Sequence, residues 1–204
     1  MFDINPFAAL SQSVSPVIMQ GFIIVMAACV AGGTLFDIIH KGSAKYFFGL
    51  VRKGAERKER EVPFGEKVSV VVNTTAHDVL TSSEFCNVKR RLAHLLTMYG
   101  FLAYVIATSV MVFAFPTPAT PAPALLVNVW WLGIVMLAVG CYWFWFFIRV
   151  DVAAEGNSPF RMVRADLFVV ALMVSASLGI VWAYLEVSGN FWSTFILGLY
   201  LLST

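Results

Sequence analysis

Three histidines are the residues of this chain best suited to cofactor chemistry. His40 ends the first long apolar segment, His94 begins the second, and His77 lies in the polar stretch between them. Neutral imidazole is a common axial ligand of haem iron, and a low-spin haem b needs two such ligands on facing helices. His40 and His94 therefore predict one haem between neighbouring helices, with His77 as a substitute ligand or a quinone-binding residue. The alternative is that His40 and His94 contact headgroups or backbone carbonyls at a membrane surface.

The remaining residues show no catalytic or metal-binding pattern. Cys29, Cys86 and Cys141 form no CxxC or CxxH pair, so no disulfide framework, zinc site or iron–sulfur site is indicated. No nucleophile elbow, P-loop, metalloprotease helix or dinucleotide fingerprint is present. We expect no catalytic residue and no metal other than a haem iron at His40 and His94. This favours a non-catalytic subunit of an oxidoreductase over an autonomous enzyme.

Four long apolar segments are the elements that must position these side chains. The chain is 59% hydrophobic and 13% charged, whereas a soluble domain is about 25% charged. A helix of about 20 residues crosses the roughly 30 Å of membrane hydrocarbon. We expect an all-α membrane protein, a single domain over 1–204 built as a bundle of four transmembrane helices. The predicted spans cover about 17–39, 94–115, 125–148 and 167–185.

The distribution of basic residues predicts the orientation of these spans. All fourteen Lys and Arg residues fall in two windows, 41–91 and 149–164, and such residues accumulate in cytoplasmic loops. The predicted loops 40–93 and 149–166 are therefore expected in the cytoplasm, with the N-terminus outside. The Pro-rich segment PTPATPAPA is then external.

The first loop carries eleven of the fourteen basic residues and is the expected docking surface for a soluble partner. Its first half, KGSAKYFFGLVRKGAERKERE, predicts an amphipathic helix, and KVSVVVNTTAHDVL places apolar residues at helical spacing. Basic residues beside a bilayer also bind anionic lipids, at about 1 kcal/mol per charge. We expect membrane lipids as further ligands and no nucleic acid. The expected docking residues are Lys45, Arg52, Lys53, Arg57, Lys58, Arg60, Lys89, Arg90 and Arg91.

The apolar tail, 187–204, is short for a further span. Its segment FWSTFILGLYLL contains about twelve residues, where about 20 are needed. We expect an interfacial or re-entrant segment, or one that packs against a partner. A short fifth crossing remains an alternative.

Other patterns predict local packing. Gly32–Gly33 in the first span permits close helix packing. Asp166 follows Arg164 closely enough for an ion pair. Tryptophan collects at both membrane interfaces, and five tryptophans lie near predicted span ends, with Trp192 just beyond the last. These five are Trp130, Trp131, Trp143, Trp145 and Trp182.

The segment DVLTSSEFCNVKRRLAHLLTMYGFLAYVIAT resembles a module of the nitrate-reductase gamma-type membrane cytochromes b. In that family an amphipathic segment leads through a basic turn into an AHLL-x-x-x-GF helix, and the membrane subunit exchanges electrons between quinone and cytoplasmic iron–sulfur proteins. The resemblance covers about thirty residues and implies that His94 is a haem ligand. Spans three and four contain no histidine, so at most one haem could be held. Its second ligand would be His40 or His77.

Most of the chain is also similar to the small membrane anchors of adenylylsulfate reductases in sulfur-oxidising bacteria. The similar segments are GGTLFDIIHKGSAKYFF, FAFPTPATP and YWFWFFIRVDVAAEGNSPFRMVRADLF. The resemblance implies a bacterial inner-membrane protein that docks a cytoplasmic flavin and iron–sulfur heterodimer and links it to the quinone pool. We then expect a quinone site near His40, His94 and Tyr99. A cofactor-free anchor, or an accessory subunit of a large respiratory or photosynthetic complex, are the alternatives.

Overall fold

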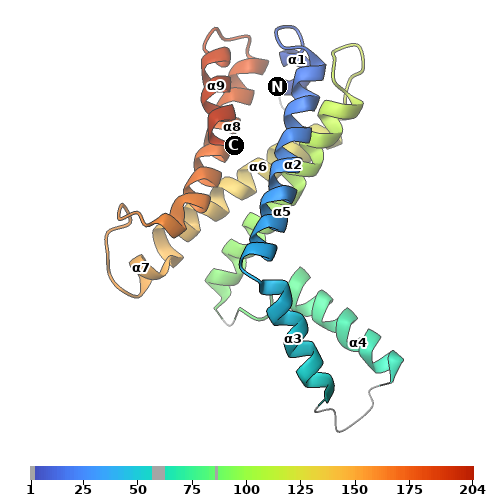
Figure 1. The fold of residues 1–204 in the computed structure, drawn as a ribbon. Helices are drawn as coiled ribbons and strands as arrows, with labels where there is room; N and C mark the ends of the chain where they lie inside the picture. Colours follow the sequence, from blue (N-terminus) through green and yellow to red (C-terminus); the bar gives the residue numbers. More distant parts are fainter. Residues whose placement is uncertain (1–2, 57–62, 86) are drawn as a thin grey trace.

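The computed structural model describes residues 3–56, 63–85 and 87–204, and this part of the chain contains helices and no strand. Figure 1 shows their arrangement. The α-helices are α1 (Pro6–Leu10), α2 (Pro16–His40), α3 (Ser43–Glu56), α4 (Phe64–Thr74), α5 (Val88–Ala114), α6 (Ala124–Trp143), α7 (Val150–Ala153), α8 (Leu167–Val187) and α9 (Ser193–Ser203). Two π-helices, η1 (Thr75–Leu80) and η2 (Phe144–Ile148), follow α4 and α6, and a 3-10 turn, η3 (Arg164–Asp166), precedes α8.

Within the described residues, four helices are long and apolar enough to cross a membrane, which supports the expected multi-pass architecture. They cover Pro16–His40, Val88–Ala114, Ala124–Ile148 and Arg164–Val187. The second begins earlier than predicted because Asn87 caps it, with its side-chain oxygen accepting from the Lys89 backbone N–H at 2.9 Å.

The described parts of the two basic windows lie at the same end of the bundle (Figure 1). We call this the basic end. The opposite end carries the α5–α6 loop with PTPATPAPA, and we call it the Pro-rich end. The amphipathic segments expected in the first loop form α3 and α4, which extend beyond the bundle at the basic end.

The closest helix pair is α5 with α6, and two facing glycines allow their backbones to meet. A Cβ added to Gly100 would lie 2.5 Å from the backbone nitrogen of Leu137. A Cβ added to Gly133 would lie 2.7 Å from the backbone nitrogen of Tyr104. Small residues are the usual way for membrane helices to approach closely.

We expect Gly133→Leu to destabilise the protein more than the roughly 1–3 kcal/mol typical of overpacking. The obstacle is backbone of α5, which cannot rotate away as a side chain can. Thermal unfolding of the detergent-solubilised protein measures the effect. Gly32→Leu is the matched control, because a Cβ on Gly32 meets nothing within 4 Å. Similar unfolding temperatures for the two variants would contradict the close approach at Gly133.

The packing predicted for Gly32–Gly33 is not found within this chain. A Cβ at either glycine would meet nothing within 4 Å, and every side chain over 27–40 is exposed. Helix α2 meets the bundle near its start, where Met19 is buried and Gln20 Nε2 donates to the Val112 carbonyl at 3.2 Å. The first span is therefore held by its Pro-rich end, and its basic half is free of intramolecular packing.

Four of the six tryptophans expected in an interfacial belt lie instead in the core, whereas Trp143 is half-buried and Trp192 is exposed. Trp130 and Trp182 are fully buried, and Trp131 and Trp145 are nearly so. Phe7 of α1 packs against Trp130 and Trp182 with ring centroids 5.8 and 5.3 Å apart. In a bundle of so few helices, large rings fill the space between α6, α8 and the short helix α1.

Helix α9 folds back along α8 from the Pro-rich end (Figure 1). Its 11 residues reach about 16 Å at 1.5 Å per residue, about half of the hydrocarbon thickness. Leu197 and Tyr200 are buried, the Tyr200 ring stacks on Trp182, and its hydroxyl hydrogen-bonds that of Tyr104. Helix α9 is thus shorter than a membrane span and packs back on α8 within the chain.

Candidate functional site

A cavity of about 330 Å³ lies at the basic end between α5, η2 and α8. Three aromatic rings and three aliphatic side chains form most of its lining, and His94, Arg90 and Thr97 contribute polar atoms. The apolar residues are Phe85, Phe144, Phe168, Ile148, Val169 and Leu172. Small-molecule sites have volumes of about 300–1,000 Å³ and combine such apolar walls with a few polar groups. The cavity is therefore the candidate functional site.

His94 is the residue of this cavity with the most versatile chemistry. Its Nδ1 lies 3.0 Å from the hydroxyl of Ser82, which is 1% exposed, and the Phe85 ring packs beside the imidazole at 5.0 Å. Since Nδ1 is occupied, Nε2 is the nitrogen that remains for a ligand. When the Ser82 hydroxyl donates to Nδ1, Nε2 carries the proton and donates; with the opposite tautomer it accepts.

Helix α5 itself holds the segment that carries Ser82. Arg91 Nε donates to the Thr81 carbonyl at 2.7 Å, and the Tyr99 hydroxyl donates to the Leu80 carbonyl at 2.6 Å. Ser82 has φ +50°, a left-handed conformation that is unfavourable for residues other than glycine. These hydrogen bonds stabilise that turn. The turn places the Ser82 hydroxyl within hydrogen-bonding distance of His94 Nδ1.

One π-helical segment lines the cavity, and a second precedes the turn that holds Ser82. The η1 helix leads directly into the Ser82 turn, and η2 contributes Phe144 and Ile148 to the wall. Single π-helical turns are rare and are frequently found at functional sites. The η2 residues in its wall support the selection of this cavity as the candidate site.

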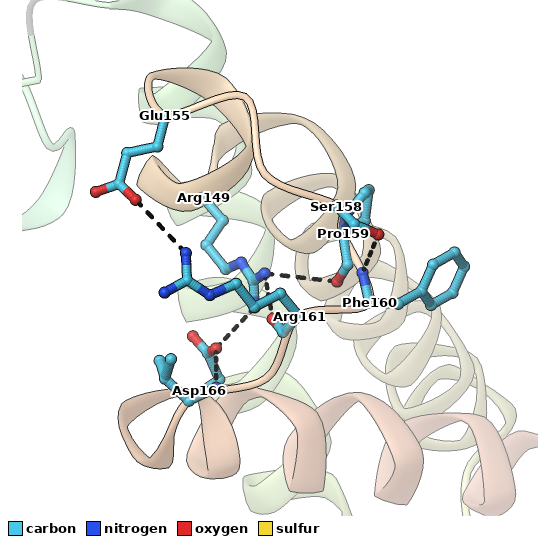
Figure 2. A network of polar contacts seen from close by, with 8 residues as sticks. Arg149, Glu155, Ser158, Pro159, Phe160, Arg161 and Asp166 are labelled. Carbon is cyan, nitrogen blue, oxygen red and sulfur yellow. Dashed lines mark hydrogen bonds and ion pairs between the residues drawn. The ribbon is translucent and has the colours of Figure 1, made fainter.

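A buried ion pair connects the two ends of the loop between η2 and α8 (Figure 2). Arg149 Nη1 lies 2.7 Å from Asp166 Oδ2, with the two side chains 5% and 13% exposed. Arg149 Nη2 also donates to the Arg161 carbonyl at 2.6 Å, and its guanidinium lies 4.1 Å over the Trp145 ring. The pair joins the end of η2 to the start of α8, the two elements that carry Ile148 and Phe168.

The sequence-based pairing of Asp166 with Arg164 is wrong. The Asp166 carboxylate pairs with Arg149, seventeen residues earlier, and it also accepts from the Val163 backbone N–H at 3.0 Å. An ion pair across a loop depends on how the loop folds, which adjacency in sequence does not reveal.

The three histidines are not brought together around one cavity. His40 lies at the exposed end of α2, where its ring stacks on Phe36 of the same helix at 5.4 Å. His77 is exposed in η1, and neither residue lines the cavity around His94. Tyr99, also expected near a quinone, is hydrogen-bonded to the Leu80 carbonyl outside it.

This arrangement does not fit a bis-histidine haem in the cavity. A haem of this type needs a second axial imidazole, and the described lining supplies one. No group of three or more His, Cys, Asp or Glu residues suited to a metal ion occurs among the described residues. A flat ring with carbonyl oxygens, as in a quinone, suits the lining better, because it needs aromatic contacts and one or two hydrogen bonds.

The residues expected to dock a partner, where the structure describes them, lie at the basic end. The exposed cations of α3 are Lys45, Arg52 and Lys53. The cations in the first turn of α5 are Lys89, Arg90 and Arg91. Three further docking residues, Arg57, Lys58 and Arg60, lie outside the described residues. Arg90 lines the cavity and Arg91 holds the Thr81 carbonyl, so these two have roles beside docking.

The sequence pointed to His94 and missed most of the residues around it. Phe85 and Ser82 precede α5, and Phe144 belongs to the aromatic run CYWFWFF, whose density was a usable signal. Phe168 has no signal in the sequence. Comparisons with protein families, with curated proteins and with solved structures found no match.

Proposed function

We propose that this chain is a membrane anchor of the bacterial inner membrane that docks a soluble flavin and iron–sulfur oxidoreductase, adenylylsulfate reductase, and links it to the quinone pool. The observation that carries the proposal is the position of the His94 cavity at the same end as the basic residues that the structure describes. By the positive-inside tendency this end lies in the cytoplasm. A partner bound there would meet a quinone-sized cavity at the membrane surface.

In this proposal a quinone headgroup binds in the His94 cavity. Phe85, Phe144 and Phe168 offer ring contacts, and offset or edge-to-face pairs of aromatic rings are favourable. His94 Nε2 donates to one carbonyl oxygen in the tautomer in which Nδ1 accepts from the Ser82 hydroxyl. Arg90 is a further donor at the same lining. The docked partner supplies two electrons from the oxidation of sulfite with AMP, and two protons complete the quinol.

Complementary charge supports the docking step. The described cations of α3 and the first turn of α5 lie on one end of the molecule, and such a surface attracts an acidic partner. Exposed charges are screened over about 8–10 Å at moderate salt. Association is therefore expected to weaken as ionic strength rises.

A second candidate, favoured by the exposure of α2, is a cofactor-free structural subunit of a large respiratory or photosynthetic complex. Over 27–40 the first span has no intramolecular packing, which suits a lateral contact with another membrane subunit. Co-purification with an integral partner, in place of a peripheral one, would favour this candidate.

Reconstitution tests the proposal directly. The purified chain in nanodiscs, mixed with purified adenylylsulfate reductase, sulfite, AMP and a soluble quinone, is expected to give quinone reduction that empty nanodiscs do not support. Raised ionic strength is expected to lower the rate. A rate equal to that of empty nanodiscs would contradict the proposal.

A reduced-minus-oxidised absorption spectrum of the same preparation tests the haem prediction. We expect no b-type α-band, because the cavity offers one imidazole. A sharp α-band would mean that a haem is held elsewhere, with His40 or His77 as a ligand.

A further inference from the structure

Helix α3 has an apolar face that no described part of the chain covers. Tyr46, Phe47, Leu50 and Val51 recur at i, i+1, i+4 and i+5, which places them on one side of a helix. Their exposed fractions are 72%, 60%, 50% and 53%. Contiguous exposed apolar surface of this kind marks an interaction site.

The rest of the α3 surface carries three exposed cations. Lys45 and Arg52 lie opposite the apolar stripe, beside the exposed Phe48, and Lys53 lies at the border of the stripe. Arg52 Nε lies 3.3 Å from Glu56 within the helix. An exposed pair of this type is weak and exchanges readily, so it does not withdraw Arg52 from a partner. The helix therefore offers an apolar stripe bordered by positive charge.

The position of α3 favours a soluble partner over the bilayer. The helix is joined to the end of the first span by Lys41 and Gly42, and it runs on beyond the basic end (Figure 1). Among the described helices, α3 chiefly contacts α2, at the junction where the two are joined. An interfacial helix would instead turn into the plane of the membrane. In this arrangement the apolar stripe lies beyond the basic end of the bundle (Figure 1).

We propose that α3 inserts its apolar face into an apolar groove of the docked soluble partner, whose rim carries carboxylates opposite Lys45, Arg52 and Lys53. Binding of an amphipathic helix in a groove is a common recognition mode with anchors at these spacings. This inference rests on the proposed function and gives its docking step an apolar component. Docking therefore survives moderate salt, and its apolar anchors are Phe47 and Leu50.

The contribution of these anchors to binding affinity is measured by titrating purified adenylylsulfate reductase onto the 204-residue chain in nanodiscs of neutral lipid. Leu50→Ser is expected to weaken binding by about tenfold, the loss typical of a buried anchor. Val70→Ser on α4 is the matched control, since Val70 is 58% exposed, and it is expected to leave binding unchanged. Both substitutions lie on exposed helix surfaces, so folding is preserved. Equal affinities for the two variants would overturn the inference and leave the proposed function standing.

A photo-crosslinking amino acid in place of Phe47 identifies what covers the stripe. Crosslinks to a reductase subunit are expected, and a crosslinker in place of Lys45 provides the comparison from the other face. Crosslinks from position 47 to lipid would assign α3 to the bilayer surface, and crosslinks to a second copy would assign it to self-association. Either result overturns the inference. Failure of the unmodified chain to bind the reductase would overturn the proposed function and this inference with it.

Discussion

Arg149→Ala is expected to destabilise the protein by about 3–5 kcal/mol, because it leaves a buried carboxylate without its counter-ion. Arg149 and Asp166 are 5% and 13% exposed and their charged atoms lie 2.7 Å apart. The substitution also removes the hydrogen bond to the Arg161 carbonyl and the contact with the Trp145 ring. We expect a lower unfolding temperature in detergent and earlier proteolysis between α6 and α8.

Arg161→Ala, in the same loop, is the matched control for the loss of stability in Arg149→Ala. Arg161 pairs with Glu155 at 4.0 Å, and both side chains are 55% exposed. Arg161→Ala is therefore expected to cost less than about 1 kcal/mol, while its backbone carbonyl still serves Arg149. Equal unfolding temperatures for Arg149→Ala and Arg161→Ala would show that the buried pair does not hold the loop.

Replacing both charged residues separates the cost of leaving one buried charge unpaired from the contribution of the ion pair itself. Arg149→Met with Asp166→Leu leaves no unpaired charge, and replacing a buried pair with apolar residues is often tolerated. We expect the double variant to unfold at a higher temperature than Arg149→Ala. Recovery should be incomplete, because the Arg161 carbonyl and the Val163 N–H lose their partners.

The spans were predictable because of how membranes constrain a backbone. In hydrocarbon every backbone polar group must be satisfied within the chain, so a long apolar run forms a helix. The four spans follow from this rule, and the helices α3 and α4 follow from apolar spacing. The grouping of both basic windows at one end follows from an even number of crossings between them.

Packing partners were not predictable in the same way, because they depend on facing surfaces. Gly32–Gly33 and Gly133 are equally small, yet only Gly133 faces another backbone closely. Trp130 lies near a span end, as a belt residue does, but α1 covers it and buries it. The charge of Asp166 predicted a pair, while the choice of Arg149 over Arg164 required the fold of the loop.

The same distinction applies to the candidate site. His94 was identifiable from its position at the start of a span, but its expected pairing with His40 assumed that α2 and α5 remain together along their length. Helix α2 meets α5 near the Pro-rich end and has no packing over 27–40. The rings that surround His94 come instead from η2, α8 and the segment before α5.

His94→Ala is expected to weaken quinone binding by about tenfold. The substitution removes one hydrogen bond of about 1–1.5 kcal/mol to a carbonyl oxygen, together with the imidazole wall beside Phe85. Titration of a soluble quinone analogue, followed by quenching of tryptophan fluorescence, measures the affinity. Ser82→Ala should give a smaller loss, since it frees the His94 ring without removing it.

His40 and His77 are the matched controls, and they separate the quinone proposal from the haem prediction. Both are exposed histidines outside the cavity, so His40→Ala and His77→Ala are expected to leave quinone affinity unchanged. A haem held between His40 and His94 would instead make His40→Ala and His94→Ala equivalent, because each would abolish the b-type α-band. If only His94→Ala weakens quinone binding and no variant shows an α-band, quinone binding at the basic end depends on His94 and not on His40 or His77. Equal losses from His40→Ala and His94→Ala would mean that α2 closes onto the cavity in the membrane, and that the quinone site extends to both helices.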